Sequence, residues 1–142
     1  MDKIRLEMTR EQGEAISAAL DLAVRIGLGQ FEEIATLMTG GIVKSTERVS
    51  TDNVCDFVRV RDQVLEGLNF AKTTLGHPIN GSYGIGSDRL DVRTLRAYEV
   101  SKVLDQALHN LRPDAGTAFK GPKSDGLVVR YTQDPAPVAV VV

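Results

Sequence analysis

The sequence predicts an α+β fold in which three long helices are combined with a small antiparallel β-sheet formed by the terminal segments. Apolar residues recur every three or four positions over much of residues 9–112, which is the period of amphipathic helices. Both ends of the chain carry short alternating or β-branched segments, which are typical of strands. A chain of 142 residues, 42% of them apolar, suits a single domain spanning residues 1–142. The helical stripes are longer than a monomer of this size covers, so we expect a homo-oligomer.

The terminal segments are expected to pair as the sheet. Residues 3–8 alternate apolar and polar side chains, which predicts a short strand. The C-terminal region 126–142 opens with a run of strand formers at residues 127–132. This run is the natural partner, because a lone strand leaves its backbone groups unpaired. The Val-rich tail at residues 138–142 is unusual for a surface in water, so we expect it to dock on its own domain or on a neighbouring subunit.

The first helix is expected to begin after Thr9. This residue is a good N-cap, and Gln12 three positions later completes a capping box. The apolar stripe then continues through Gly27 and Gly29 until the glycine pair at residues 40–41 stops it. Each glycine inside a helix costs about 1 kcal/mol relative to alanine. Close packing of a second helix is the favoured reason for the first two glycines, and a kink or the approach of a ligand are the alternatives.

Two further helices follow. Thr51 or Asp52 is expected to cap the second, which ends at Gly76, a good residue for the position after a helix. Asp91 is expected to cap the third, which ends before Pro113.

Composition excludes several broad classes of function. The net charge of −2 argues against a general nucleic-acid binder, which would carry a basic field. No apolar run approaches the roughly 18 residues needed to cross a bilayer. The first residues lack the apolar centre of a signal peptide, so we expect a cytoplasmic location.

The sequence predicts a protein that is not an enzyme and needs no metal or cofactor. It contains neither a Walker A motif nor a dinucleotide fingerprint. His77, His109 and Cys55 are too few soft ligands for a zinc site. Glu11 and Glu14 form half of the carboxylate pattern found in magnesium-dependent, all-α pyrophosphohydrolases, but the second half is missing.

The most informative segment is the loop at residues 76–87, which holds four of the thirteen glycines. Asn80, Ser82 and His77 bring hydrogen-bonding groups, and Tyr83 offers an aromatic face. Loops of this composition often bind small molecules, because their exposed N–H groups and an aromatic ring can converge on one ligand. The alternative is an Ω-loop that packs on itself.

Arginines accompany this loop. Three follow it at spacings of four and three residues, which predicts adjacent turns at the start of the third helix. Because a guanidinium matches two phosphate oxygens, the combination suggests an anionic ligand with a planar base. The alternative is a solvated helix face, neutralised by neighbouring acids. The arginines are Arg89, Arg93 and Arg96, with Arg25, Arg59 and Arg61 on earlier helices, and the acids are Asp88, Asp91 and Glu99.

Three segments resemble a family of small proteins encoded by phages and prophages. They are residues 26–34 (IGLGQFEEI), residues 77–85 with His-Pro followed by GSYGI, and residues 96–104 (RAYEVSKVL). On these segments the chain resembles the first type of Thoeris anti-defence protein. The resemblance implies a non-enzymatic sponge, which sequesters a cyclic ADP-ribose signal made by a bacterial TIR-domain enzyme. It also implies a homo-oligomer with pockets between subunits, built from dimers up to a hexamer, and in some members separate sites for cyclic oligonucleotides.

The resemblance further implies the kinds of ligand contact. An aromatic residue would stack on adenine, an asparagine would hydrogen-bond to the ligand, and arginines would hold the pyrophosphate. The runner-up function is a helical protein-interaction module that inhibits or regulates a host protein, in which the loop is structural. With the loop serine and all three arginines after the loop included, the predicted ligand-binding residues are Arg25, Arg61, Phe70, Asn80, Ser82, Tyr83, Arg89, Arg93 and Arg96.

Overall fold

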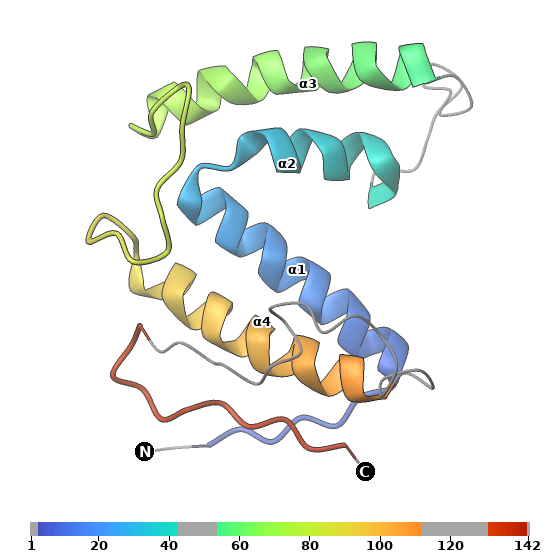
Figure 1. Ribbon diagram of the computed structural model, residues 1–142, viewed down its shortest axis with the longest axis vertical. Coiled ribbons are helices and arrows are strands. Elements are labelled where there is room, and N and C mark those ends of the chain that lie inside the picture. Colours follow the sequence, from blue (N-terminus) through green and yellow to red (C-terminus); the bar gives the residue numbers. More distant parts are fainter. Residues whose placement is uncertain (1–2, 43–53, 112–130, 142) are drawn as a thin grey trace. The chain divides into compact units, whose positions relative to one another are not determined.

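The computed structural model describes residues 3–42, 54–111 and 131–141, and all regular secondary structure within these ranges is helical (Figure 1). The predicted α+β class is therefore wrong for the described part of the chain. The elements are α1 (Arg10–Leu28), α2 (Phe31–Leu37), a π-helical turn η1 (Met38–Ile42), α3 (Val54–Thr74) and α4 (Val92–Asn110).

The chain divides into two compact units. One combines Met1–Val24 with Val92–Val142 and contains most of α1, α4 and the terminal segments. The other is Arg25–Asp91 and contains the last turn of α1, α2, α3 and the loop that follows α3. We refer to them as the terminal unit and the central unit. None of the helices in the described ranges is long and apolar enough to cross a membrane.

The expected sheet is absent from the described residues. Residues 3–8 have no secondary structure assigned to them, and most of their predicted partner, residues 127–130, lies outside the described ranges. Tyr131 and Thr132 are described, but both of their backbone N–H groups donate to the carboxylate of Glu99 on α4. Those donors are therefore satisfied by a side chain and not by a neighbouring strand.

The start of α1 confirms the predicted capping box. The backbone N–H of Gln12 donates to Thr9 Oγ1 at 3.3 Å, and the side chain of Gln12 accepts from the Thr9 N–H at 2.9 Å. Within the terminal unit α1 packs on α4 at Gly13, where an added Cβ would lie 3.2 Å from Leu108 Cδ2. Ser17 on α1 also donates a hydrogen bond to Asp105 on α4.

The predicted continuous first helix is wrong, because the chain turns at Gly29. This residue has φ of +78°, in the left-handed region that favours glycine. Its N–H donates to Ile26 O at 3.2 Å, and the N–H of Gln30 donates to Arg25 O at 2.9 Å. These two bonds form a Schellman motif, which satisfies the last carbonyls of α1. Gly29 therefore ends a helix, and α2 starts two residues later at Phe31.

The end of α3 confirms the prediction for Gly76. Its φ is +79°, and it forms a second Schellman motif, with bonds from Gly76 N–H to Thr73 O at 3.0 Å and from His77 N–H to Lys72 O at 3.1 Å. Helix α4 begins at Val92, one residue after the predicted cap. The proposed caps Thr51 and Asp52 of the second helix, and Pro113 beyond the third, lie outside the described residues.

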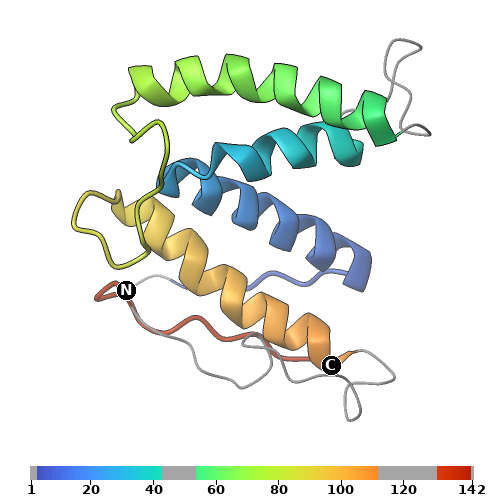
Figure 2. The same cartoon turned by 45° about the horizontal axis from the view of Figure 1, so that its top comes forward.

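The core of the central unit lies where α2 packs against α3, and the two helices run side by side in both views (Figures 1 and 2). Phe31, Ile34 and Ala35 are buried on one face of α2, as expected for residues three and four positions apart. Leu28 at the end of α1 joins them.

The C-terminal segment lies along α4 within the terminal unit (Figures 1 and 2). The described tail residues lie beside α4 but stay largely in solvent, with Val138, Val140 and Val141 82%, 74% and 47% exposed, so docking of the tail on its own domain or on a neighbouring subunit stays a prediction. Helix and tail border an open hollow of about 420 Å³, lined by Val103, Gln106, Ala107, Asn110, Ala139, Val140 and Val141.

Candidate functional site

The loop after α3 folds around His77. The imidazole lies against Gly29, where an added Cβ would approach Nδ1 to 2.7 Å. Its ring centroid is 5.9 Å from that of Phe31 and 5.3 Å from that of Tyr83, and both pairs are tilted. His77 thus connects the end of α1, the start of α2 and the loop. Sequence reasoning identified His77 only as a hydrogen-bonding group of the loop and missed this packing role.

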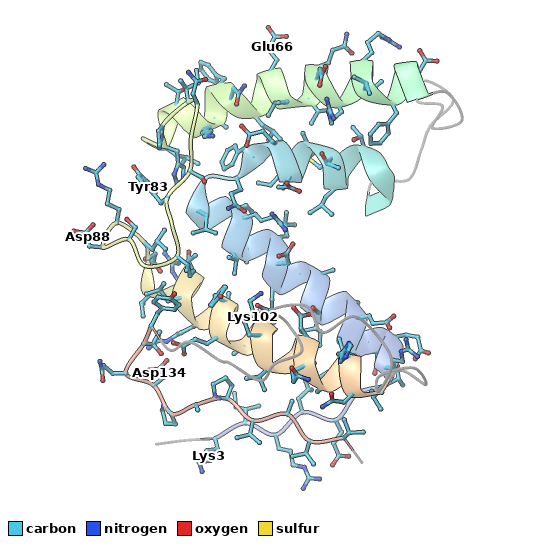
Figure 3. All side chains as sticks on the ribbon, viewed as in Figure 1. Lys3, Glu66, Tyr83, Asp88, Lys102 and Asp134 are labelled. Carbon is cyan, nitrogen blue, oxygen red and sulfur yellow. The ribbon has the colours of Figure 1, made fainter. Side chains whose placement is uncertain are left out.

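Tyr83 is fixed to the central unit by hydrogen bonds. Its backbone N–H donates to Leu28 O at 2.8 Å, and its hydroxyl donates to Gly76 O at 3.2 Å. Because Leu28 is the last residue of α1 and Gly76 follows the end of α3, Tyr83 is bonded close to both helix ends. The half-buried ring lies tilted against that of His77, so the loop packs on itself to that extent. Figure 3 shows Tyr83 on this loop, with Asp88 further along it.

Arg89 completes the cluster. Its Nη1 donates to the Tyr83 hydroxyl at 3.4 Å, and its Cζ lies 5.7 Å from the centroid of the Tyr83 ring. The hydrogen bond to Tyr83 raises the pKa of Arg89, with a further contribution from the charge of Tyr83, so the guanidinium keeps its positive charge. The arginine itself is exposed. A held aromatic ring and an exposed, permanent cation form a surface suited to a planar, anionic molecule.

Two predicted ligand arginines of the central unit are bound to their neighbours. Arg25 donates to Gln30 Oε1 at 3.0 Å and lies 3.9 Å from a Glu33 carboxylate oxygen. Arg61 donates to Asp62 Oδ1 from Nε at 3.1 Å and from Nη2 at 2.8 Å. Arg61 is also about 20 Å along α3 from its last residue, at 1.5 Å per residue. Helix α3 therefore does not bring Arg61 to the start of the loop.

Three other predicted residues of the central unit are exposed. Phe70 on α3 is 79% exposed, although an aromatic residue on this helix is expected more often in a core. Asn80 and Ser82 lie on the loop with their surfaces in solvent. Such side chains can reach a ligand without rearrangement of the core.

Arg93 and Arg96 belong to the terminal unit, whereas Arg89 precedes α4 and belongs to the central unit. The predicted run of three arginines on one helix is therefore wrong, and only the last two share α4. Arg96 forms a two-pronged ion pair with Asp134, with Nε 2.5 Å from Oδ2 and Nη2 3.2 Å from Oδ1. The sequence did not indicate Asp134 as a partner.

Glu99 is the residue that sequence reasoning most misjudged. It was expected as a countercharge to the arginines, but it is only 2% exposed. Its carboxylate accepts the N–H of Tyr131 at 2.6 Å, the N–H of Thr132 at 2.7 Å and the Thr132 hydroxyl at 2.8 Å. A signal was present, because Glu99 is four residues after Leu95 and four before Val103, on the apolar stripe.

Tyr98 and Lys102 form a small cluster next to this anchor. The Tyr98 ring meets Tyr131 edge-on at 5.8 Å, and Lys102 Nζ lies 5.1 Å from the Tyr98 centroid. Burial raises the pKa of the Tyr98 phenol, and the charge of Tyr131 adds to the effect. Lys102 is labelled in Figure 3 on α4.

A second buried polar group lies between α2 and α3. The Lys72 side chain is fully buried, with Nζ 3.7 Å from Glu32 Oε1. Among the described residues, neither Lys72 Nζ nor His77 Nδ1 has a hydrogen-bond partner. No group of three or more His, Cys, Asp or Glu residues that could hold a metal ion occurs in the described ranges.

Comparison with family models, with curated proteins and with solved structures found no match. The resemblance to the Thoeris anti-defence proteins therefore rests on the three sequence segments given above.

Proposed function

We propose that the protein binds a cyclic nucleotide of the cyclic ADP-ribose class and holds it unchanged, so that the signal does not reach its receptor. The observation that carries this proposal is the pairing of Tyr83 and Arg89 on one loop. The guanidinium lies over the ring, so the pair together offers an aromatic surface, a positive charge and several donors to a phosphate. The resemblance supplies the ligand class, and the location it implies is the cytoplasm of an infected or lysogenic bacterium.

The loop is suited to binding because it is held in place before a ligand arrives. Bonds to the ends of α1 and α3 fix Tyr83, and packing on His77 fixes its ring. Pre-organisation of this kind lowers the entropy cost of binding. Sequestration requires complementarity to the ground state of the ligand, and this needs no base, nucleophile, metal or cofactor.

The affinity that sequestration requires favours an assembly of several copies of the chain. Competition with a receptor calls for nanomolar binding, roughly −12 kcal/mol. A stacked base contributes about 1–3 kcal/mol and a charged hydrogen bond about 1.5–3 kcal/mol, so Tyr83 and Arg89 supply at most half. Exposed apolar residues occur on the end of α3 and the loop, where Phe70, Leu75 and Ile79 are 79%, 64% and 54% exposed. A second copy covering them would enclose the ligand and supply the remaining contacts in a homo-oligomer.

Native mass spectrometry of the purified protein tests the proposal directly. The protein is measured alone and with cyclic ADP-ribose isomers and cyclic di- and trinucleotides, and the bound ligand is then released by heat and analysed. We expect an intact cyclic nucleotide from a defined oligomer. A chemically altered ligand would overturn the non-enzymatic part, and no binding at micromolar concentrations would overturn the whole proposal.

A pair of arginine variants tests the role of the loop. Arg89→Ala is expected to lower the affinity about tenfold or more, because a charged hydrogen bond is lost. Arg59→Ala is the matched control, since Arg59 is exposed on α3 and pairs at 3.8 Å with Asp56. Equal affinities for the two variants would show that the loop arginine is not a ligand contact.

The exposed apolar residues also support a second candidate, a helical module that binds a host protein. In that case Phe70→Ser would abolish anti-defence activity, and the protein would bind no cyclic nucleotide. The sequestration proposal instead predicts nucleotide binding by the wild-type protein. Native mass spectrometry with cyclic nucleotides therefore distinguishes the two candidates, because only the sequestering protein binds one.

A further inference from the structure

Residues 3–8 of the terminal unit are an extended stretch that leads into α1 (Figures 1 and 2). Arg5 Nη2 lies 2.8 Å from Glu7 Oε1, so two side chains two positions apart point to the same side, as they do in a β-strand. Within the described part of the chain, no backbone group of residues 3–8 is bonded to another backbone group. The stretch therefore has the form of a strand that lacks a neighbour.

The apolar side chains of this stretch are exposed. Ile4 and Leu6 alternate with the charged pair and are 96% and 66% exposed. Met8 is 37% exposed, and its Sδ lies 3.6 Å from the position that a Cβ at Gly13 would take. Exposed apolar side chains on an unpaired, extended backbone are the features that favour the addition of a second strand.

The order of the charges selects a second copy of the same stretch in one register. In an antiparallel pair centred on Leu6, this residue lies opposite Leu6 of the second copy. Ile4 then lies opposite Met8 on each side of the centre, and Arg5 lies opposite Glu7. An antiparallel pair centred on Arg5 or Glu7, or a parallel pair in register, would place like charges opposite each other. A shift by one residue would place apolar side chains opposite charged ones.

We propose that residues 3–8 pair with residues 3–8 of a second copy in the antiparallel register centred on Leu6, which makes them a two-fold interface between copies. The pairing gives the free backbone groups partners and brings the exposed apolar side chains of the two copies together. It also exchanges the ion pair within one chain for two ion pairs between chains. The inference is independent of any ligand and of the exposed apolar residues near the loop, which belong to the central unit.

Disulfide cross-linking tests the register, with Cys55, the one cysteine of the chain, replaced by serine in every variant. Leu6→Cys should form a linked dimer, because Cβ atoms of opposite residues lie about 4.5–5.5 Å apart. Ile4→Cys is the matched control. Its two copies would lie four positions apart along the strands, or about 13 Å, which is too far for a disulfide. A mixture of Ile4→Cys with Met8→Cys should again form linked dimers.

Each result of the cross-linking has a definite meaning. Failure of Leu6→Cys to form a linked dimer overturns the interface. Equal linkage of Leu6→Cys and Ile4→Cys with themselves overturns the register, because random collision would then explain both. Because residues 3–8 precede α1, these variants should keep the helices, and circular dichroism checks this.

Charge reversal tests the ion pairs, with the dissociation constant of the assembly measured by sedimentation velocity. Arg5→Glu places like charges opposite each other and should weaken association about fivefold or more. The double variant Arg5→Glu/Glu7→Arg restores opposite charges and should recover the wild-type association. Arg59→Glu, at an exposed arginine on α3, is the control and should leave association unchanged. A double variant that associates no better than Arg5→Glu, or a wild type that stays monomeric, would overturn the inference.

Discussion

Alanine at Gly29 should destabilise the protein much more than alanine at Gly76. The two glycines have nearly the same φ, +78° and +79°, and each ends a helix in a Schellman motif. They differ in surroundings, because an added Cβ at Gly29 would lie 2.7 Å from His77 Nδ1, whereas nothing lies within 4 Å at Gly76. The pair therefore separates the cost of the backbone conformation from the cost of contact with the imidazole.

The expected magnitudes follow from these two terms. A left-handed conformation costs an alanine about 1–2 kcal/mol, partly offset by about 0.4–1 kcal/mol from the reduced entropy of its unfolded chain. Gly76→Ala should therefore lower the free energy of unfolding by about 1 kcal/mol. Gly29→Ala should cost a further 1–3 kcal/mol or so, because the displaced His77 ring loses its contacts with Phe31 and Tyr83, at about 0.5–1.5 kcal/mol for each pair.

Urea unfolding followed by circular dichroism at 222 nm measures both values, with each variant at the same protein concentration. His77→Ala provides the control background, in which the extra cost at Gly29 should disappear. Equal free energies of unfolding for Gly29→Ala and Gly76→Ala would refute the reasoning. So would an extra cost that persists without the imidazole, since the contact could not then be its cause.

Three further predictions concern stability and titration. Gly67→Ala should raise the free energy of unfolding by about 1 kcal/mol, because Gly67 lies inside α3 with open space at its Cβ position; a decrease would show an unrecognised contact. Glu99→Gln should speed amide hydrogen exchange at Tyr131 and Thr132, and unchanged exchange would show that the carboxylate is not the anchor. Tyr98 should titrate above the usual pKa of 10.0, so its contribution to stability is full below that pH and is lost as pH rises through the folded-state pKa. Absorbance at 295 nm, compared with Tyr98→Phe, checks this, and a native midpoint at or below the denatured one would contradict it.

Local signals in the sequence were interpreted correctly. The capping box of Thr9 and Gln12, the end of α3 at Gly76 and the start of α4 after Asp91 all appear as predicted. Each depends on residues within about four positions, which is the range of helix hydrogen bonds and caps. Such features are settled by short-range chemistry and can be predicted without knowledge of the packing.

The continuity of α1 and α2 could not be predicted in this way. The apolar stripe stays in phase across the break, since Leu28, Phe31 and Ala35 all enter the same core. The pattern of hydrophobic residues is therefore the same for one helix or two. What distinguishes them is the positive φ of Gly29 and the imidazole of His77 against it, a contact between residues far apart in the chain.

The candidate site was predicted only in part. The loop and its Tyr83 were identified from composition, and Arg89 from its position after the loop. The structure pairs those two, holds Arg61 against Asp62 and holds Arg96 against Asp134. A count of arginines indicates available charge, but it does not indicate which carboxylate neutralises each one.

By itself the sequence determined most of the helices, their caps and the loop with its chemistry, because these follow from periodicity and from residues near one another in the chain. The tertiary structure alone decided where the polar groups of the termini are satisfied. Burial of Glu99 gives the N–H groups of Tyr131 and Thr132 a carboxylate acceptor, and residues 3–8 form no strand. The physical reason is that a hydrogen bond or ion pair forms only between two groups that lie close together in space. The positions of the two residues in the sequence do not reveal whether the fold brings them together.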